Sequence, residues 1–131
     1  MRSSSLFLSV SLLFIVYPRQ VTAASFAYIT NEDSHTVSVV DTATNSVTTT
    51  IAVGDFPKSV AVDRAGTRVY VAHARRGVLP SGLSVIDTST NTVVTTVGFG
   101  PDVYLPPFGV AVNPAGTRVY VTSGPLGKKL W

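Results

Sequence analysis

Short apolar segments recur along the chain after residue 25, separated by turns rich in Gly, Asp, Asn and Thr. Within several of them, such as VSVVD and LSVID, large apolar residues alternate with small or polar ones. A period of two is typical of β-strands, and turn residues at short intervals indicate antiparallel connections. The pattern therefore predicts an all-β protein built from short antiparallel strands.

The pattern is an internal repeat. The sequence AGTRVYV occurs twice without a change, at Ala65–Val71 and at Ala115–Val121. Self-similarity at a fixed spacing is the signature of repeat architectures. We divide the chain into a first repeat at residues 26–68, a second at 69–118 and an incomplete third at 119–131.

Each repeat predicts four strands. In the first repeat they are FAYITN, TVSVVD, SVTTTIAV and KSVAVD; the second has VYVAH, LSVID, TVVTTV and FGVAVN, and the third begins with VYVTS. The spacing from Tyr28 to Tyr70 is 42 residues and that from Tyr70 to Tyr120 is 50. Four strands in 40 to 50 residues are typical of β-propeller blades. The predicted fold is a partial β-propeller of about two and a half four-stranded blades.

The turns contain polar residues that stabilise tight connections. Asp63–Gly66 and Asn113–Gly116 place Asp or Asn first and Gly fourth, as in type I turns. The segments DTATN and DTSTN, which begin at Asp41 and Asp87, place carboxylates beside short turns. Recurring aspartates could also indicate catalysis or calcium binding, but their position in turns favours a structural role.

These motifs resemble a known family. Tyr28-Ile29-Thr30-Asn31 followed by VSVVDTATNSV, and Tyr70-Val71 followed by LSVIDTSTNTV, are similar to the YVTN-type β-propeller repeat of exported and surface-layer proteins. The fourth letter of the motif varies, because His73 and Ser123 stand where the first repeat has Asn31. The resemblance implies a propeller fold, export, and roles in surface binding or scaffolding. It implies no catalytic residue.

The N-terminal segment predicts export. Residues 1–23 combine Arg2, an apolar run at Leu6–Val16 and small residues at Val21–Ala23, as in a cleavable signal peptide. We expect a periplasmic, extracellular or cell-surface protein with no stable membrane span, because the apolar run is too short for one. Without these residues the net charge is about +1, which does not favour nucleic-acid binding.

Two insertions in the second repeat predict a binding surface. They are ARRGVLPSG at Ala74–Gly82 and GFGPDVYLPP at Gly98–Pro107, and in an up-and-down sheet both lie on the same side. Long loops on a rigid scaffold frequently carry binding residues. The candidates for contact with a protein or surface polymer are His73, Arg75, Arg76, Phe99, Asp102 and Tyr104. Alternatively, the arginines are solvated loop residues and the aromatic rings cover an apolar edge.

No catalytic or metal site is predicted. The chain has no cysteine and only two histidines, His35 and His73, which are too few to define a metal site. No cofactor is therefore assigned. The leading hypothesis is a non-catalytic binding or scaffold module. The alternative is a fragment of a propeller enzyme with a metal or redox cofactor at the propeller axis.

The number of predicted strands is incompatible with a closed propeller. Nine strands are too few for a ring of four to eight blades, and nine is not a multiple of four. We therefore expect an N-terminal piece of a longer propeller, whose open edges favour self-association or pairing with complementing blades.

Overall fold

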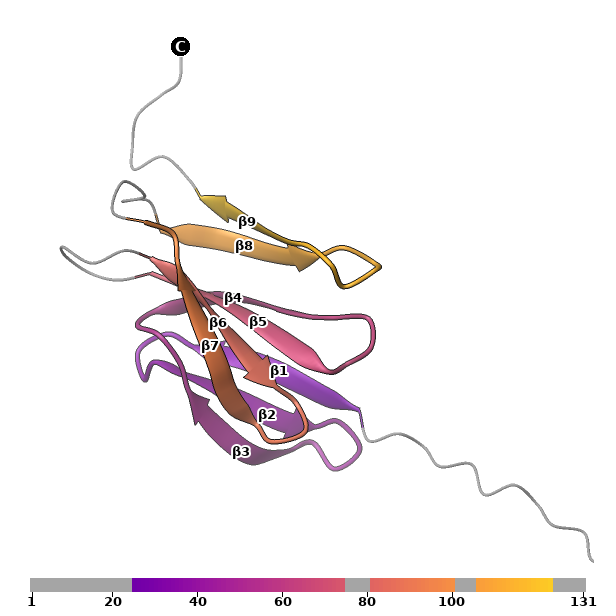
Figure 1. The fold of residues 1–131 in the computed structure, drawn as a ribbon. Helices are drawn as coiled ribbons and strands as arrows, with labels where there is room; N and C mark the ends of the chain where they lie inside the picture. Colours follow the sequence, from indigo (N-terminus) through magenta and orange to yellow (C-terminus); the bar gives the residue numbers. More distant parts are fainter. Residues whose placement is uncertain (1–24, 75–80, 101–105, 124–131) are drawn as a thin grey trace, which may run out of the picture.

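The computed structural model describes residues 25–74, 81–100 and 106–123, and these form strands and no helix (Figure 1). The strands are β1 (Phe26–Asn31), β2 (Thr36–Asp41), β3 (Ser46–Ala52), β4 (Pro57–Val62), β5 (Arg68–His73), β6 (Gly82–Asp87), β7 (Thr92–Gly98), β8 (Pro107–Val112) and β9 (Val119–Ser123). All nine predicted strands are present within the described residues. The all-β prediction is confirmed.

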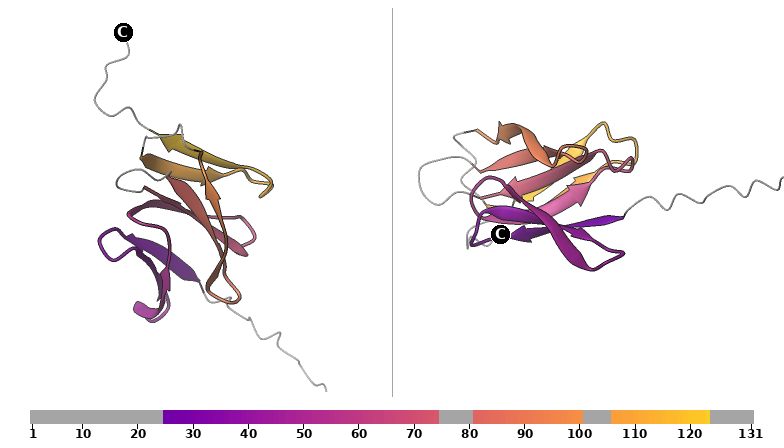
Figure 2. Two further views of the ribbon diagram at one scale, coloured as in Figure 1. Left: turned by 60° about the vertical axis from the view of Figure 1, so that its left-hand side comes forward. Right: turned by 90° about the horizontal axis from the view of Figure 1, so that it is seen from below.

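The strands form three antiparallel sheets. The first has the order β1-β2-β3, the second β4-β5-β6-β7 and the third β8-β9. Figures 1 and 2 show the sheets stacked in chain order, with the second between the other two. Strand β4 lies beside β8, and β1 lies beside β4. The first strands of neighbouring sheets therefore lie side by side.

The sheets are offset from the sequence repeats by one strand. The fourth strand of the first repeat, β4, pairs with β5 of the second repeat and not with β3. Likewise β8 pairs with β9 of the third repeat. The sheets therefore do not coincide with the sequence repeats. The physical reason lies in the connections: the tight AGT turns keep β4 beside β5, whereas residues 53–56, with a positive φ of 48° at Phe56, lead out of the first sheet.

The AGT turns form as predicted. The Gly66 N–H donates to the Asp63 carbonyl at 3.0 Å, and the Gly116 N–H donates to the Asn113 carbonyl at 2.9 Å. Both glycines have a φ of 70°, which a residue with a Cβ adopts only with strain. The side chain of the first residue also accepts from the N–H of the fifth, Thr67, at 2.7 Å. Each turn closes an antiparallel hairpin.

The recurring aspartates of the DTATN and DTSTN segments are turn residues. The Ala43 N–H donates to Asp41 Oδ1 at 2.7 Å, and the Ser89 N–H donates to Asp87 Oδ1 at 2.8 Å. Each turn ends with an asparagine at positive φ, which asparagine tolerates better than most residues. The structural interpretation of both aspartates is confirmed.

The core lies between the first two sheets. It contains six buried aliphatic residues, three from each sheet: Val37, Val39, Ile51, Val69, Val71 and Ile86. Strand β6 is buried along almost its whole length, as predicted for a sheet covered on both faces. By contrast, Phe108 and Tyr120 in the third sheet are 63% and 55% exposed. The apolar packing therefore weakens towards the third sheet.

Candidate binding surface

The connections between strands divide the described structure into two sides. On the first, which we call the loop side, hydrogen bonds link successive connections to one another. The Phe56 N–H donates to His35 Nδ1 at 3.0 Å, the Ala74 N–H to the Phe56 carbonyl at 3.2 Å, and the Phe99 N–H to the Ser81 carbonyl at 2.9 Å. Ala74 begins the first insertion, Ser81 is its second-last residue, and Phe99 is the second residue of the second insertion. Both insertions therefore start from the loop side.

The opposite side, which we call the turn side, carries the short turns. The Thr42 N–H donates to the Ser25 carbonyl at 3.0 Å, and the Thr88 N–H donates to the Thr67 carbonyl at 3.2 Å. These bonds connect the DTATN and DTSTN turns with the starts of β1 and β5. In the part of the chain that is described, the long connections and the short turns therefore lie on opposite sides, as predicted.

Two of the six candidate binding residues can be placed. His73 ends β5, and Phe99 follows β7 directly and is partly exposed. The other four lie outside the described residues: Arg75, Arg76, Asp102 and Tyr104. Ser81 bonds to Phe99, so the bases of the two insertions are joined at one point.

His73 lies at the base of the first insertion but beneath the surface. Only 7% of it is exposed. A Cβ added to Gly54 would lie 2.2 Å from its Nδ1, and one added to Gly82 would lie 2.8 Å from its Cε1. The imidazole therefore fills a space that exists only because two neighbouring residues are glycines. Its position indicates that it packs the 53–56 connection against β6.

A second histidine on the loop side was not predicted to be structural. His35 has a φ of 57°, its ring centroid lies 4.7 Å from that of Phe56, and the two rings meet edge to face at 77°. Both residues adopt positive φ; histidine is one of the residue types enriched in this region, whereas phenylalanine gives no such signal in sequence. Because His35 Nδ1 already accepts from the Phe56 N–H, this ring holds the 53–56 connection in place.

Neither a metal site nor a membrane-spanning helix is found in the described ranges. No three His, Cys, Asp or Glu side chains there are close enough together to hold one ion. The same ranges contain no helix with the length and apolar character that crossing a bilayer requires.

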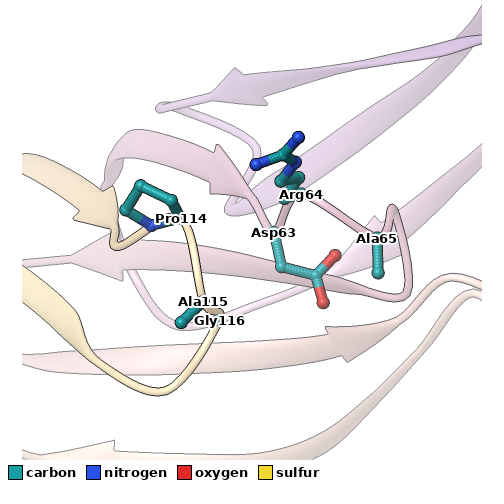
Figure 3. A pocket seen from close by; sticks show the side chains of 6 residues that line it. All are labelled: Asp63, Arg64, Ala65, Pro114, Ala115 and Gly116. Atoms are coloured by element: carbon teal, nitrogen blue, oxygen red, sulfur yellow. The ribbon is translucent and has the colours of Figure 1, made fainter.

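The turn side contains a hollow that the sequence did not predict. It has a volume of about 330 Å³ and lies between the two AGT turns (Figure 3). Its lining consists of Asp63, Arg64, Ala65, Pro114, Ala115 and Gly116. The hollow therefore lies where the β4-β5 and β8-β9 hairpins of two neighbouring sheets end.

Asp63 is the one carboxylate among the residues that line this hollow, and it is hydrogen-bonded within its own turn. Asp63 accepts from the Thr67 N–H and hydroxyl, both at 2.7 Å, and from the Arg68 N–H at 3.2 Å. Burial alone would raise the pKa of Asp63, but these hydrogen bonds together with one from Gly66 outweigh it and lower the pKa. Asp63 is therefore an ionised turn residue and a poor candidate for a general acid or base.

A second hollow, of about 420 Å³, lies on the same side between the first two sheets. It is lined by Ser25, Phe26, Tyr28, Val62, Gly66 and Thr88. Burial raises the pKa of Tyr28, so its hydroxyl stays protonated at neutral pH. Neither hollow places a nucleophile beside a base. What the two hollows offer to a ligand is a complementary shape and hydrogen-bonding groups.

Solved structures similar to this chain include the two described below. No protein-family model matches the sequence, and no curated protein matches it. A chain of Kuenenia stuttgartiensis hydrazine synthase is 29% identical, with a TM-score of 0.69, over 79% of this chain and 28% of that one. A functionally unknown protein from Desulfotomaculum acetoxidans is 13% identical, with a TM-score of 0.55, over 66% of this chain and 26% of that one. The chain thus spans little more than a quarter of each, and the second similarity concerns the fold alone.

Proposed function

We propose that this chain is part of an exported β-propeller of the YVTN type that binds a protein or surface polymer without catalysing a reaction. Three features support a propeller: antiparallel sheets stacked in chain order, first strands that lie side by side, and small residues in those strands. Ser59 and Ala61 in β4 and Gly109 and Ala111 in β8 allow close approach where blades converge towards an axis.

The observation that carries the binding role is the Phe99–Ser81 backbone bond of 2.9 Å. It joins the bases of both long connections, so the two insertions begin and end close to one another on the scaffold. Below them, His73 is packed between Gly54 and Gly82 and gives the loops a fixed support. Arginine and aromatic residues are common anchors in protein interfaces, and loops on a rigid scaffold are where such anchors gather.

Matched variants on the two sides test this role. The loop-side variant combines Arg75→Ala and Phe99→Ala; the turn-side control, Arg64→Ala, removes the same charge. Both are incubated with envelope fractions of the native host, separated into protein and polymer, and the bound fraction is measured. We expect the loop-side variant to lose at least about tenfold in affinity, as for interface anchors, and the control to bind like the natural chain. Equal binding by both variants would contradict the proposal.

Export is tested separately. The intact mass of the protein recovered from its host, with cytoplasm, envelope and medium separated, should correspond to a chain without residues 1–23 and should occur outside the cytoplasm. An uncleaved chain confined to the cytoplasm would refute export and leave the binding experiment to be interpreted on its own.

A second candidate function is an enzyme fragment. The similarity to the hydrazine synthase chain favours it, since that protein is an enzyme and the identity extends over most of this chain. In this reading a metal or redox cofactor at the propeller axis would need polar residues from several blades. Elemental analysis after exposure to divalent metals and dialysis distinguishes the two candidate functions. Stoichiometric metal retained by the protein supports the enzyme fragment. If no metal is retained, the non-catalytic binding module is favoured.

A further inference from the structure

The 53–56 connection, which leads from β3 to β4, is held at both of its ends by His35. The Val53 N–H donates to the His35 carbonyl at 3.0 Å, and the Phe56 N–H donates to His35 Nδ1, also at 3.0 Å. The rings of His35 and Phe56 meet edge to face, with their centroids 4.7 Å apart. The start of the connection is therefore bound to the backbone of His35, and its end is bound to the imidazole.

Phe56 has an unfavourable backbone conformation at this point. Its φ of 48° is uncommon for a residue with a bulky side chain. The next residue is Pro57, and contact with a proline ring drives the preceding residue towards extended conformations. Strained conformations of this kind persist only where the surrounding structure holds them. The bond from the Phe56 N–H to His35 is one of the interactions that hold this one.

The acceptor of that bond is an atom that a proton can remove. One ring nitrogen of a neutral imidazole accepts a hydrogen bond, but both ring nitrogens of a protonated imidazole are donors. Histidine makes this change between about pH 8 and pH 5. His35 is partly exposed, unlike His73, so protons from the solvent reach it. After protonation at Nδ1, two N–H groups would face each other and the bond to Phe56 would be lost.

The charged and titratable groups near His35 do not replace this acceptor. Those on the neighbouring elements are Glu32 and Asp33 in the β1-β2 connection, Asp55 in the 53–56 connection, Lys58 on β4 and His73 at the end of β5. The acidic groups attract a positively charged ring, whereas Lys58 and a protonated His73 repel it. Glu32 and Lys58 are already paired with each other. None of these charges changes the bonding capacity of Nδ1, which depends only on whether that nitrogen carries a hydrogen.

A change in Phe56 would reach the base of the first insertion. The Phe56 carbonyl accepts from the N–H of Ala74, the residue that follows β5 and begins the insertion, at 3.2 Å. Gly54, in the same connection, packs against the buried ring of His73. Residues 53–56 are therefore linked to the end of β5 by one backbone bond and one close contact.

We propose that His35 and Phe56 form an acid-sensitive latch on the loop side. Above about pH 7, Nδ1 of His35 holds the Phe56 amide. As the pH falls, a proton from the solvent occupies Nδ1, Phe56 relaxes towards an extended conformation, and its carbonyl releases the Ala74 amide. The base of the first insertion is thereby ordered at neutral pH and loosened in acid. This inference goes beyond the proposed binding role and does not depend on it.

Nuclear magnetic resonance of the full chain between pH 8 and pH 5 tests the latch. The nitrogen shifts of the His35 ring report where its protons lie, and hydrogen exchange gives a protection factor for each amide. We expect an Nδ1 without a proton at pH 8, and protection of Phe56 and Ala74 that falls about fivefold as His35 is protonated, as for one hydrogen bond. The amides of Gly66 and Gly116, which donate to carbonyls on the turn side, are the internal control and should not change.

The variant His35→Asn separates protonation from other effects of acid. Asparagine tolerates positive φ and offers an oxygen acceptor on a short side chain, but it does not titrate in this range. We expect the protection of Phe56 in this variant to be the same at pH 8 and pH 5. The variant His35→Ala has no acceptor, and its Phe56 amide should be weakly protected at both pH values.

The outcomes distinguish the parts of the proposal. A proton on Nδ1 of His35 at pH 8, or protection of Phe56 that is equal at pH 8 and pH 5 in the natural chain, overturns the latch without recourse to a variant. A fall in protection that follows the titration of His73 in place of His35 also overturns it. Unchanged protection of Ala74 while that of Phe56 falls overturns the link to the insertion. Partner binding is measured with the loop-side and turn-side variants, so its failure leaves these results unchanged.

Discussion

The identical segment AGTRVYV has two different environments in this molecule. In β5, Val69 and Val71 are fully buried between the first two sheets. In β9 the equivalent Val119 and Val121 are only partly buried, and Tyr120 is 55% exposed. Local sequence therefore determines the hairpin and the strand, because both form in both places. The burial of the valine side chains depends instead on how many strands the neighbouring sheets contribute. The same residues stabilise one junction strongly and the other weakly.

The largest effect is expected where the second sheet is packed most closely. The variant Gly54→Ala places a Cβ 2.2 Å from Nδ1 of the buried His73, so the 53–56 connection or the imidazole must move. We expect a loss of about 3 kcal/mol in the free energy of unfolding, as for overpacked cores, measured by urea denaturation. The control Gly109→Ala approaches only the Thr122 hydroxyl, at 2.9 Å, and should cost less than about 1 kcal/mol. Equal losses of stability in the Gly54→Ala and Gly109→Ala variants would contradict this difference between the two regions.

A smaller difference is expected from the repeated segment itself. Val71→Ala removes two methyl groups from a fully buried position and should lower the free energy of unfolding by about 2 kcal/mol. Val121→Ala makes the same chemical change in β9 and should cost less than about 1 kcal/mol, because Val121 is only partly buried. Parallel urea denaturation of both variants checks this. A greater loss for Val121→Ala would show that the third sheet is better covered than its exposure indicates.

The smallest effect concerns the AGT turns. Asp63 and Asn113 accept the same backbone bonds, but only Asp63 titrates, and its pKa is lowered in the folded chain. Its stabilisation is complete above the unfolded pKa and is lost as the pH falls through the lower, folded pKa. The Asp63→Asn variant should therefore have the same free energy of unfolding as the natural chain at pH 7. Between about pH 5 and pH 2 its free energy of unfolding should fall less than that of the natural chain.

Urea denaturation at a series of pH values measures this difference. Asp33→Asn, in the exposed connection between β1 and β2, is the control for loss of a carboxylate outside such a turn. If the Asp33 and Asp63 variants respond to acid alike, the hydrogen bonds of the turn are not the cause.

The sequence predicted the strands and the turns because their signals are local. Alternation in LSVID, glycine at Gly66 and asparagine at Asn45 each act within a few residues. The assignment of strands to sheets was not predicted, since it depends on the 53–56 connection and on positive φ at Phe56, a residue type with no such preference. The burial of His73 depends on Gly54, which is distant in sequence and adjacent in space. Of the candidate binding residues, the structure describes only His73 and Phe99.

The offset between repeats and sheets has a consequence for changes in chain length. Each complete sheet contains the last strand of one repeat and the first three of the next. Inserting or deleting one whole repeat, wherever the cut falls, therefore adds or removes one complete sheet and restores every hairpin at the new boundary. Inserting or deleting any other number of strands leaves either an AGT hairpin that lacks its second strand or a sheet that lacks its first strand. Complete sheets are therefore gained or lost only as whole repeats, wherever the boundary between repeats is drawn.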